Sequence, residues 1–141
     1  YEKKLKAKAD VRVIPNACPL FVPLVENGYT HKDNPVLRLV AQEYLAPLLD
    51  GQVDTIILGC THYPLLKEAI SELCPGITLI DVGQQAAMTV SRSLNEAGLA
   101  ASQGEGNYRF FVTDTTENFA HYGSIFLNQP INGQVERVEL T

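Results

Sequence analysis

The chain has 141 residues, a formal charge of −5 and a pI near 5.1. It lacks the strong excess of Lys and Arg that a nucleic-acid surface needs, so nucleic acid is excluded as a main partner. Hydrophobic residues make up 45% of the sequence, enough for a packed core in one domain or in part of a two-domain protein. The basic residues near the start are interpreted as a solvated helix face: Lys3, Lys4, Lys6, Lys8 and Arg12.

The three cysteines, Cys18, Cys60 and Cys74, are an odd number without a C-x-x-C pair. This usage favours a reducing compartment, where thiols are catalytic or simply buried, over a secreted disulfide framework. We expect no signal peptide, and no apolar run is long enough to span a bilayer. The sequence therefore predicts a cytoplasmic protein without a membrane partner.

The first third of the chain predicts short helices and one strand. Residues 1–9 have apolar side chains at i, i+4 and i+8, which indicates the end of a helix. The β-branched residues 11–14 predict a strand, and the proline-interrupted run 18–28 predicts an apolar loop or a short helical turn. Asn34 and Pro35 are a capping residue and a first-turn proline, so a helix is predicted from there to about residue 50.

The rest of the chain alternates between strands and helices. The apolar run 54–58 predicts a buried strand, followed by a turn at 59–63 and a helix at 64–73. The later elements are a strand at 77–80, a helix at 83–97, a polar linker at 102–107, a strand at 108–112, a helix at 117–126 and a strand at 135–140. Strands that alternate with helices through short connections predict an α/β fold with a mostly parallel sheet flanked by helices.

The turn after the strand at 54–58 carries the residues best suited to chemistry. In open α/β sheets, ligands bind beyond the carboxyl ends of the strands, and a helix begun by Pro64 would add free N–H groups and a positive dipole there. Both features favour a thiolate at Cys60 and a bound carboxylate. Gly59 allows a ligand to approach the backbone closely. Thr61 offers a hydroxyl to the charged ends of an amino acid, and His62 can accept or pass a proton near neutral pH.

Spacing alone leaves other interpretations of Cys60 open. It favours a buried structural cysteine beside a capping Thr-His pair, and it also allows a thiol–imidazole nucleophile that includes His62. A zinc site is disfavoured, because the other cysteines and histidines lie beside prolines or have no paired donors. These poor ligands are Cys18, Cys74, His31 and His121.

Several acidic residues lie near predicted turns. Glu26 follows an apolar run, where a solvated loop end is the ordinary interpretation and a functional acid the alternative. Asp81 stands at a strand end before a helix, and a helix cap is favoured over a site-lining acid. Asp114 stands three residues before Glu117, so the pair predicts a capping box.

The motif Leu58-Gly59-Cys60-Thr61-His62-Tyr63-Pro64-Leu65 resembles the second-cysteine motif of glutamate racemases, in the aspartate/glutamate racemase superfamily. Further segments resemble the same family in the same order along the chain, at residues 17–26, 79–81, 109–113 and 135–140. The resemblance covers essentially the whole chain, and the Cys-Thr-His sequence is its most specific part. It implies that the α/β fold is part of a two-domain racemase.

The resemblance also implies an activity. Such an enzyme interconverts L- and D-glutamate for peptidoglycan synthesis, needs no cofactor or metal, and places two cysteines on opposite faces of the substrate. Cys60 matches the cysteine that deprotonates the L-enantiomer, His62 would relay its proton, and Glu26 would orient His62. Thr61 and Gly59 would bind the substrate. Because an α-proton is weakly acidic, fixed donors around the carboxylate must stabilise the transition state.

The family's first half, which brings the other cysteine, has no counterpart in this sequence. We therefore expect residues 1–84 to form most of the second domain and residues 85–141 to pack on the first. We also expect this fragment to be inactive alone, to expose apolar faces around Val90 and Phe126, and to belong to a homodimer in the full-length enzyme. Two alternatives stay open: an aspartate or other amino-acid racemase of the superfamily, and a non-catalytic binding module. A first cysteine encoded upstream would favour the enzyme.

Overall fold

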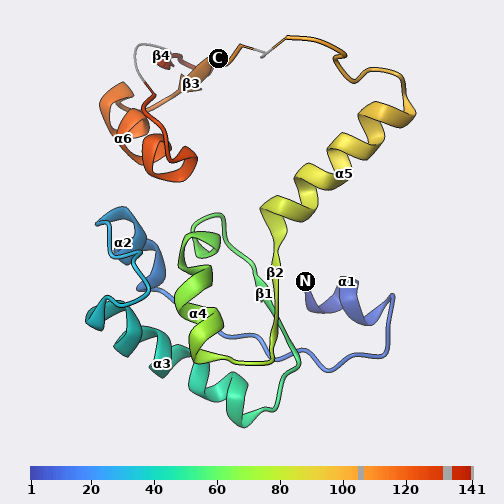
Figure 1. Cartoon of the computed structure of the whole chain (residues 1–141), viewed down its shortest axis with the longest axis vertical. Helices are drawn as coiled ribbons and strands as arrows, with labels where there is room; N and C mark the ends of the chain where they lie inside the picture. Colours follow the sequence, from blue (N-terminus) through green and yellow to red (C-terminus); the bar gives the residue numbers. More distant parts are fainter. Residues whose placement is uncertain (105–106, 132–134, 141) are drawn as a thin grey trace. The chain divides into compact units, whose positions relative to one another are not determined.

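The computed structural model describes residues 1–104, 107–131 and 135–140. The chain divides into two compact units, Tyr1–Ala87 and Met88–Thr141. The first unit contains α1 (Glu2–Lys6), α2 (Phe21–Glu26), α3 (Pro35–Asp50), β1 (Thr55–Leu58), the 3-10 helix η1 (Tyr63–Leu66), α4 (Lys67–Leu73), β2 (Thr78–Asp81) and the start of α5 (Val82–Glu96) (Figure 1). The second unit contains the rest of α5, β3 (Phe110–Val112), α6 (Thr116–Leu127) and β4 (Val135–Arg137).

The core of the first unit is organised by α3, which begins at its predicted cap. The Asn34 side chain accepts hydrogen bonds from the backbone N–H groups of Val36 and Leu37 at 3.0 and 3.1 Å, which confirms the cap. One face of the helix is buried at helical spacing, through Leu37, Ala41, Leu45 and Leu48. It packs in one cluster with buried residues of α2, β1, η1 and α4: Phe21, Val25, Ile56, Leu58, Leu66, Ala69, Ile70 and Cys74.

Strands β1 and β2 pair in parallel, with Leu58 opposite Asp81. Because parallel strands end at the same edge, the turn after β1 and the start of α5 after β2 lie at one edge of this sheet. The Asp81 carboxylate accepts a hydrogen bond from the Gln84 N–H at 3.0 Å, which confirms the predicted helix cap. The predicted α/β class with parallel strands is confirmed.

The strand predicted at residues 11–14 is wrong. This segment lies within the described range 1–104 and is irregular, with Ile14 packed on the core through its side chain. A strand needs a neighbour to share its backbone hydrogen bonds, and among the described residues β1 pairs only with β2. β-Branched composition supplied the propensity here, but tertiary structure did not supply a partner.

Two predicted helix starts also differ from the structure. The helix predicted at 64–73 is divided into η1 and α4, because Leu66 leaves the α-helical region with φ −101° and ψ 5°. The capping box predicted for Asp114 and Glu117 is wrong. The extended residue before α6 is Thr115, and within the described residues its side chain makes no capping bond. The helix therefore begins one residue too late for Asp114 to serve as its cap.

The second unit is built around the parallel pair β3–β4 and the helix α6. The rings of Phe110 and Phe119 lie 5.7 Å apart, which joins strand and helix. Ile131 is buried, and its N–H donates to the Ser124 hydroxyl at 3.0 Å. Gly123 permits this packing, because a Cβ there would lie 2.5 Å from the Ile131 Cδ1 atom.

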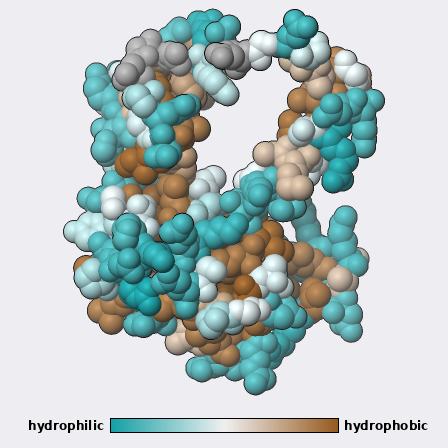
Figure 2. Space-filling model, viewed as in Figure 1, coloured by the Kyte–Doolittle hydropathy of each residue, from teal (hydrophilic) through white to brown (hydrophobic). Residues whose placement is uncertain are grey.

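Helix α5 exposes apolar side chains: Met88, Val90 and Leu94 are 53%, 57% and 40% accessible. Hydrophobic and hydrophilic residues both lie on its surface (Figure 2). The exposure expected around Val90 is therefore present. The boundary expected after residue 84 falls within α5, three residues before the division at Ala87, and the assignment of the two units to racemase domains stays a prediction. Among the described helices, none is long and apolar enough to cross a membrane.

Candidate active site

Cys60 lies in the turn just beyond β1, where it is partly buried. Its sulfur is 4.0 Å from the Nδ1 atom of His62, a long hydrogen-bond distance for a thiol. The Thr61 hydroxyl oxygen lies 3.2 Å from the same nitrogen. The side chains of three consecutive residues therefore meet at His62 Nδ1.

The second nitrogen of the imidazole, Nε2, contacts the last residue of α2. His62 Nε2 lies 3.3 Å from the Glu26 Oε1 atom, and the two side chains are 20% and 35% exposed. A carboxylate can only accept a hydrogen bond, so the Nε2 atom carries the proton in this contact. The neutral imidazole then presents its lone pair at Nδ1, toward Cys60 and Thr61. This Glu26–His62–Cys60 row has the order in which a base activates a thiol and a carboxylate fixes the base.

The helix-terminus contribution expected at Cys60 is smaller than the sequence suggested. The element that follows is the four-residue η1, and α4 begins only at Lys67. The Tyr63 N–H donates to the Cys60 carbonyl at 3.3 Å, and the Leu65 N–H donates to the His62 carbonyl at 3.1 Å. These two N–H groups are therefore engaged within the turn and are not free to bind a ligand or the Cys60 sulfur.

Gly59 and Thr61 are both exposed at this edge of the sheet. A Cβ on Gly59 would lie 3.7 Å from the Tyr1 ring and 3.9 Å from the Ile57 carbonyl oxygen, which are ordinary contact distances. The protein's own packing therefore does not require glycine at this position. Its backbone is exposed, and the predicted approach of a ligand to it stays a prediction.

Tyr63 belongs to the site, although sequence reasoning did not single it out. Its hydroxyl donates to the Cys18 carbonyl at 3.2 Å. The rings of Tyr44 and Tyr63 each meet the ring of Phe21 edge-to-face at 5.3 Å. Burial, followed by the neighbouring Cys18, Cys60 and Tyr44 groups, raises the pKa of Tyr63, so its hydroxyl is a proton donor at neutral pH. The available signal was an aromatic residue with a polar tip directly after His62.

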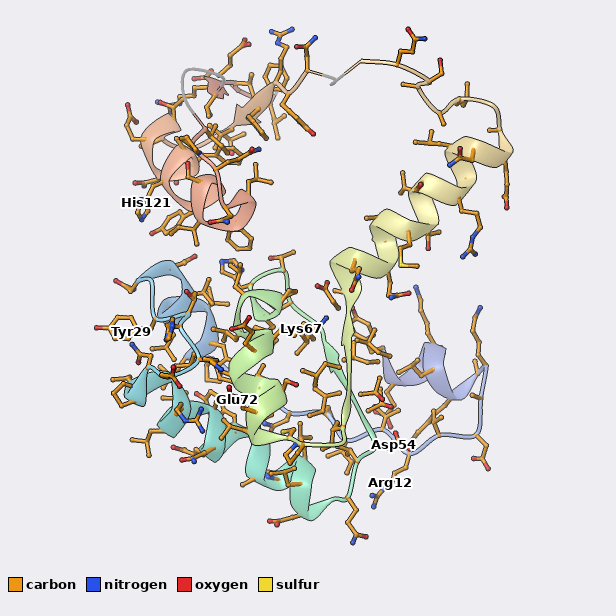
Figure 3. All side chains as sticks on the ribbon, in the orientation of Figure 1. Arg12, Tyr29, Asp54, Lys67, Glu72 and His121 are labelled. Atoms are coloured by element: carbon orange, nitrogen blue, oxygen red, sulfur yellow. The ribbon has the colours of Figure 1, made fainter. Side chains whose placement is uncertain are left out.

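The other two cysteines and the other two histidines lie outside this row of catalytic candidates. Burial raises the pKa of the Cys18 thiol and of the Cys74 thiol, and both cysteines are free. His31 is exposed beside Asp33, at 3.7 Å, and His121 is exposed on α6 (Figure 3). Within the described ranges, no group of three or more His, Cys, Asp or Glu side chains is arranged to hold a metal ion.

A separate charged cluster lies where α4 meets α3 and the segment before it. The Glu72 carboxylate accepts hydrogen bonds from Lys32 at 2.6 Å and from Arg38 at 2.9 Å. Figure 3 labels Glu72 on α4. The Lys32 and Arg38 hydrogen bonds hold the pKa of Glu72 below its ordinary value, and the same carboxylate raises the pKa of Lys32. These contacts join α4 to α3 and to the segment before α3.

Fold and site together define an α/β protein with a thiol–imidazole–carboxylate row at the carboxyl end of a parallel strand. No family model matches the chain. The curated glutamate racemase of Syntrophus aciditrophicus is 43% identical over 133 residues, which cover 93% of this chain and 48% of that protein. 

Solved structures give the same result. The glutamate racemase of Francisella tularensis, in complex with D-glutamate, superposes with a TM-score of 0.83 at 34% identity and covers 98% of this chain and 51% of its own. The isoform RacE1 of Bacillus anthracis gives a TM-score of 0.85 at 33% identity, over 99% and 52%. The chain belongs to the glutamate racemase family, and it spans about half the length of the relatives it matches.

Proposed function

We propose that this chain supplies one of the two catalytic thiols of a glutamate racemase, an enzyme that interconverts L- and D-glutamate without a cofactor. Family membership and the D-glutamate bound to the Francisella relative support the substrate. The observation that carries the proposal is the row of Glu26, His62 and Cys60, with 3.3 Å and 4.0 Å between successive groups. Such a row moves a proton to and from sulfur.

The proposed reaction begins when the Cys60 thiolate takes the α-proton of L-glutamate. The electron pair of that C–H bond stays on the α-carbon, and Cys60 becomes a thiol. A second thiol, from the part of the enzyme that this chain does not cover, gives its proton to the opposite face and is left as a thiolate. D-Glutamate results. In the reverse direction Cys60 is the thiol that donates the proton.

His62 prepares Cys60 for this exchange. Its Nδ1 lone pair accepts the thiol proton before the reaction, and Glu26 stabilises the imidazolium that forms. The Thr61 hydroxyl competes for the same nitrogen at 3.2 Å. We propose that this hydroxyl turns toward the substrate when the substrate binds, and that the exposed backbone at Gly59 contacts the substrate as well. The His62 Nδ1 atom can then accept the proton of the Cys60 thiol. The substrate would thus complete the base that acts on it.

The cellular role follows the same proposal. D-Glutamate made in the cytoplasm would enter peptidoglycan, and the full-length enzyme would act as a homodimer. The partner in the reaction is a small molecule.

The test is racemase activity of the full-length gene product, followed by circular dichroism with D- and L-glutamate. Changing Cys60→Ala should abolish turnover, because the thiolate that takes the α-proton of L-glutamate is then absent. Cys18→Ala is the matched control, a second partly buried thiol that should keep at least half of the activity. Normal turnover by the Cys60 variant would disprove the role of this thiol. Faster turnover of aspartate than of glutamate would reassign the substrate, and no turnover of either by the unchanged protein would favour a binding module.

A further inference from the structure

The adjacent residues His62 and Tyr63 bind the two ends of one segment. His62 Nε2 meets the carboxylate of Glu26, the last residue of α2, at 3.3 Å. The Tyr63 hydroxyl donates to the carbonyl of Cys18, just before α2, at 3.2 Å. Residues 18–26 are therefore fastened at both ends to a single dipeptide of the Cys60 turn.

Tyr63 makes both of its contacts at the beginning of α2. Its ring is fixed edge-to-face on Phe21, the first residue of α2, and is partly buried. The ring and the hydroxyl thus hold the beginning of α2, while the Glu26 carboxylate links its other end to the imidazole. The Cys18 carbonyl also accepts the Phe21 N–H at 3.1 Å, so it keeps a partner without Tyr63.

We propose that Tyr63 is a positioning residue, which sets the contact of Glu26 with His62 by holding the start of α2 against the Cys60 turn. This inference rests on the proposed function, since the contact matters for catalysis only if His62 handles the Cys60 proton. Tyr63 follows His62 directly in the chain, so its hydrogen bond to Cys18 fixes the start of α2 relative to the turn that carries the imidazole, whereas Tyr44 fixes α2 relative to α3. Without that bond the turn can shift relative to α2, and the contact between His62 Nε2 and Glu26 Oε1 depends on this spacing, because a hydrogen bond weakens as its donor–acceptor distance grows.

The change that isolates this role is Tyr63→Phe. It keeps the ring on Phe21, removes one hydrogen bond, and leaves no buried carbonyl without a partner. We expect kcat to fall about threefold to tenfold, the effect of losing one hydrogen bond, with KM within twofold, because the substrate contacts are unchanged. The imidazole ¹⁵N shifts of His62 should move toward those of Glu26→Gln, which removes the carboxylate directly.

The matched control is Tyr44→Phe. The Tyr44 hydroxyl accepts the Leu20 N–H at 3.3 Å, and the Tyr44 ring also packs edge-to-face on Phe21. Tyr44 belongs to α3, however, and not to the Cys60 turn. It should lower thermal stability about as much as Tyr63→Phe, with kcat and the His62 shifts unchanged. Equal effects of the two variants on His62 would overturn the inference, since they would indicate general packing of α2. Unchanged His62 shifts in Tyr63→Phe would overturn it as well.

The nuclear magnetic resonance result does not depend on turnover. If Cys60→Ala keeps full activity while Tyr63→Phe still moves the His62 shifts, the proposed function fails and the positioning role of Tyr63 stands. If Cys60→Ala is inactive and the His62 shifts stay in place, only the positioning role fails.

Discussion

The carboxylate of Glu26 offers a direct measure of how the site is polarised. Replacing it by Gln keeps the size and shape of the side chain and removes the charge next to the imidazolium that the proposed proton transfer would form. For unit charges 3.3 Å apart, the attraction is about 1.3 kcal/mol in water and about 5 kcal/mol near a protein surface. The side chains are 20% and 35% exposed, which places the interaction in the lower part of that range. We take roughly 1.5–3 kcal/mol, or a fall in kcat/KM of about 10- to 100-fold.

The assay is steady-state racemisation of D- and L-glutamate by the full-length protein, with circular dichroism as the readout. The two enantiomers have equal free energies in solution, so kcat/KM must fall by the same factor in both directions. Glu43→Gln, which neutralises an exposed carboxylate on α3, is the matched control and should change nothing. A folded Glu26→Gln enzyme within twofold of the unchanged protein would refute the reasoning that the carboxylate supports His62.

Three further predictions concern stability and reactivity. Leu37→Ala removes a fully buried side chain of α3 and should lower the free energy of unfolding by about 2–5 kcal/mol in urea titrations; a loss below 1 kcal/mol would contradict the assigned core. The pKa of Glu72 lies below its ordinary value of 4.5 because Lys32 and Arg38 bind its charged form. The pair therefore stabilises the fold above about pH 4.5, and this stabilisation disappears as the pH falls through the lowered pKa. Glu72→Gln should lower the melting temperature at pH 7 and not at pH 2, and a deficit as large at pH 2 would argue against the ion pairs. Burial raises the pKa of the Cys74 thiol, so iodoacetamide should label it slowly at pH 7.5 in peptide mapping, and labelling as fast as in the unfolded chain would show that it is accessible.

The helices and strands near the site were largely readable from local sequence. Asn34 and Pro35 predicted the start of α3, and the apolar run before Gly59 predicted β1, because caps and periodicity act over a few residues. The same local reasoning failed at residues 11–14, where strand formation depended on a neighbour. It also failed at Asp114, where the backbone of Thr115 decided the cap.

The sequence by itself determined that Cys60, Thr61 and His62 share one turn at the end of a buried strand, since they are consecutive residues. The resemblance added Glu26, but only the tertiary structure decided that its carboxylate meets His62 Nε2 and thereby turns Nδ1 toward the thiol. The link from Tyr63 to Cys18 was likewise invisible in the sequence. Such contacts depend on the path of the chain between distant segments and on side-chain direction, and local patterns carry neither.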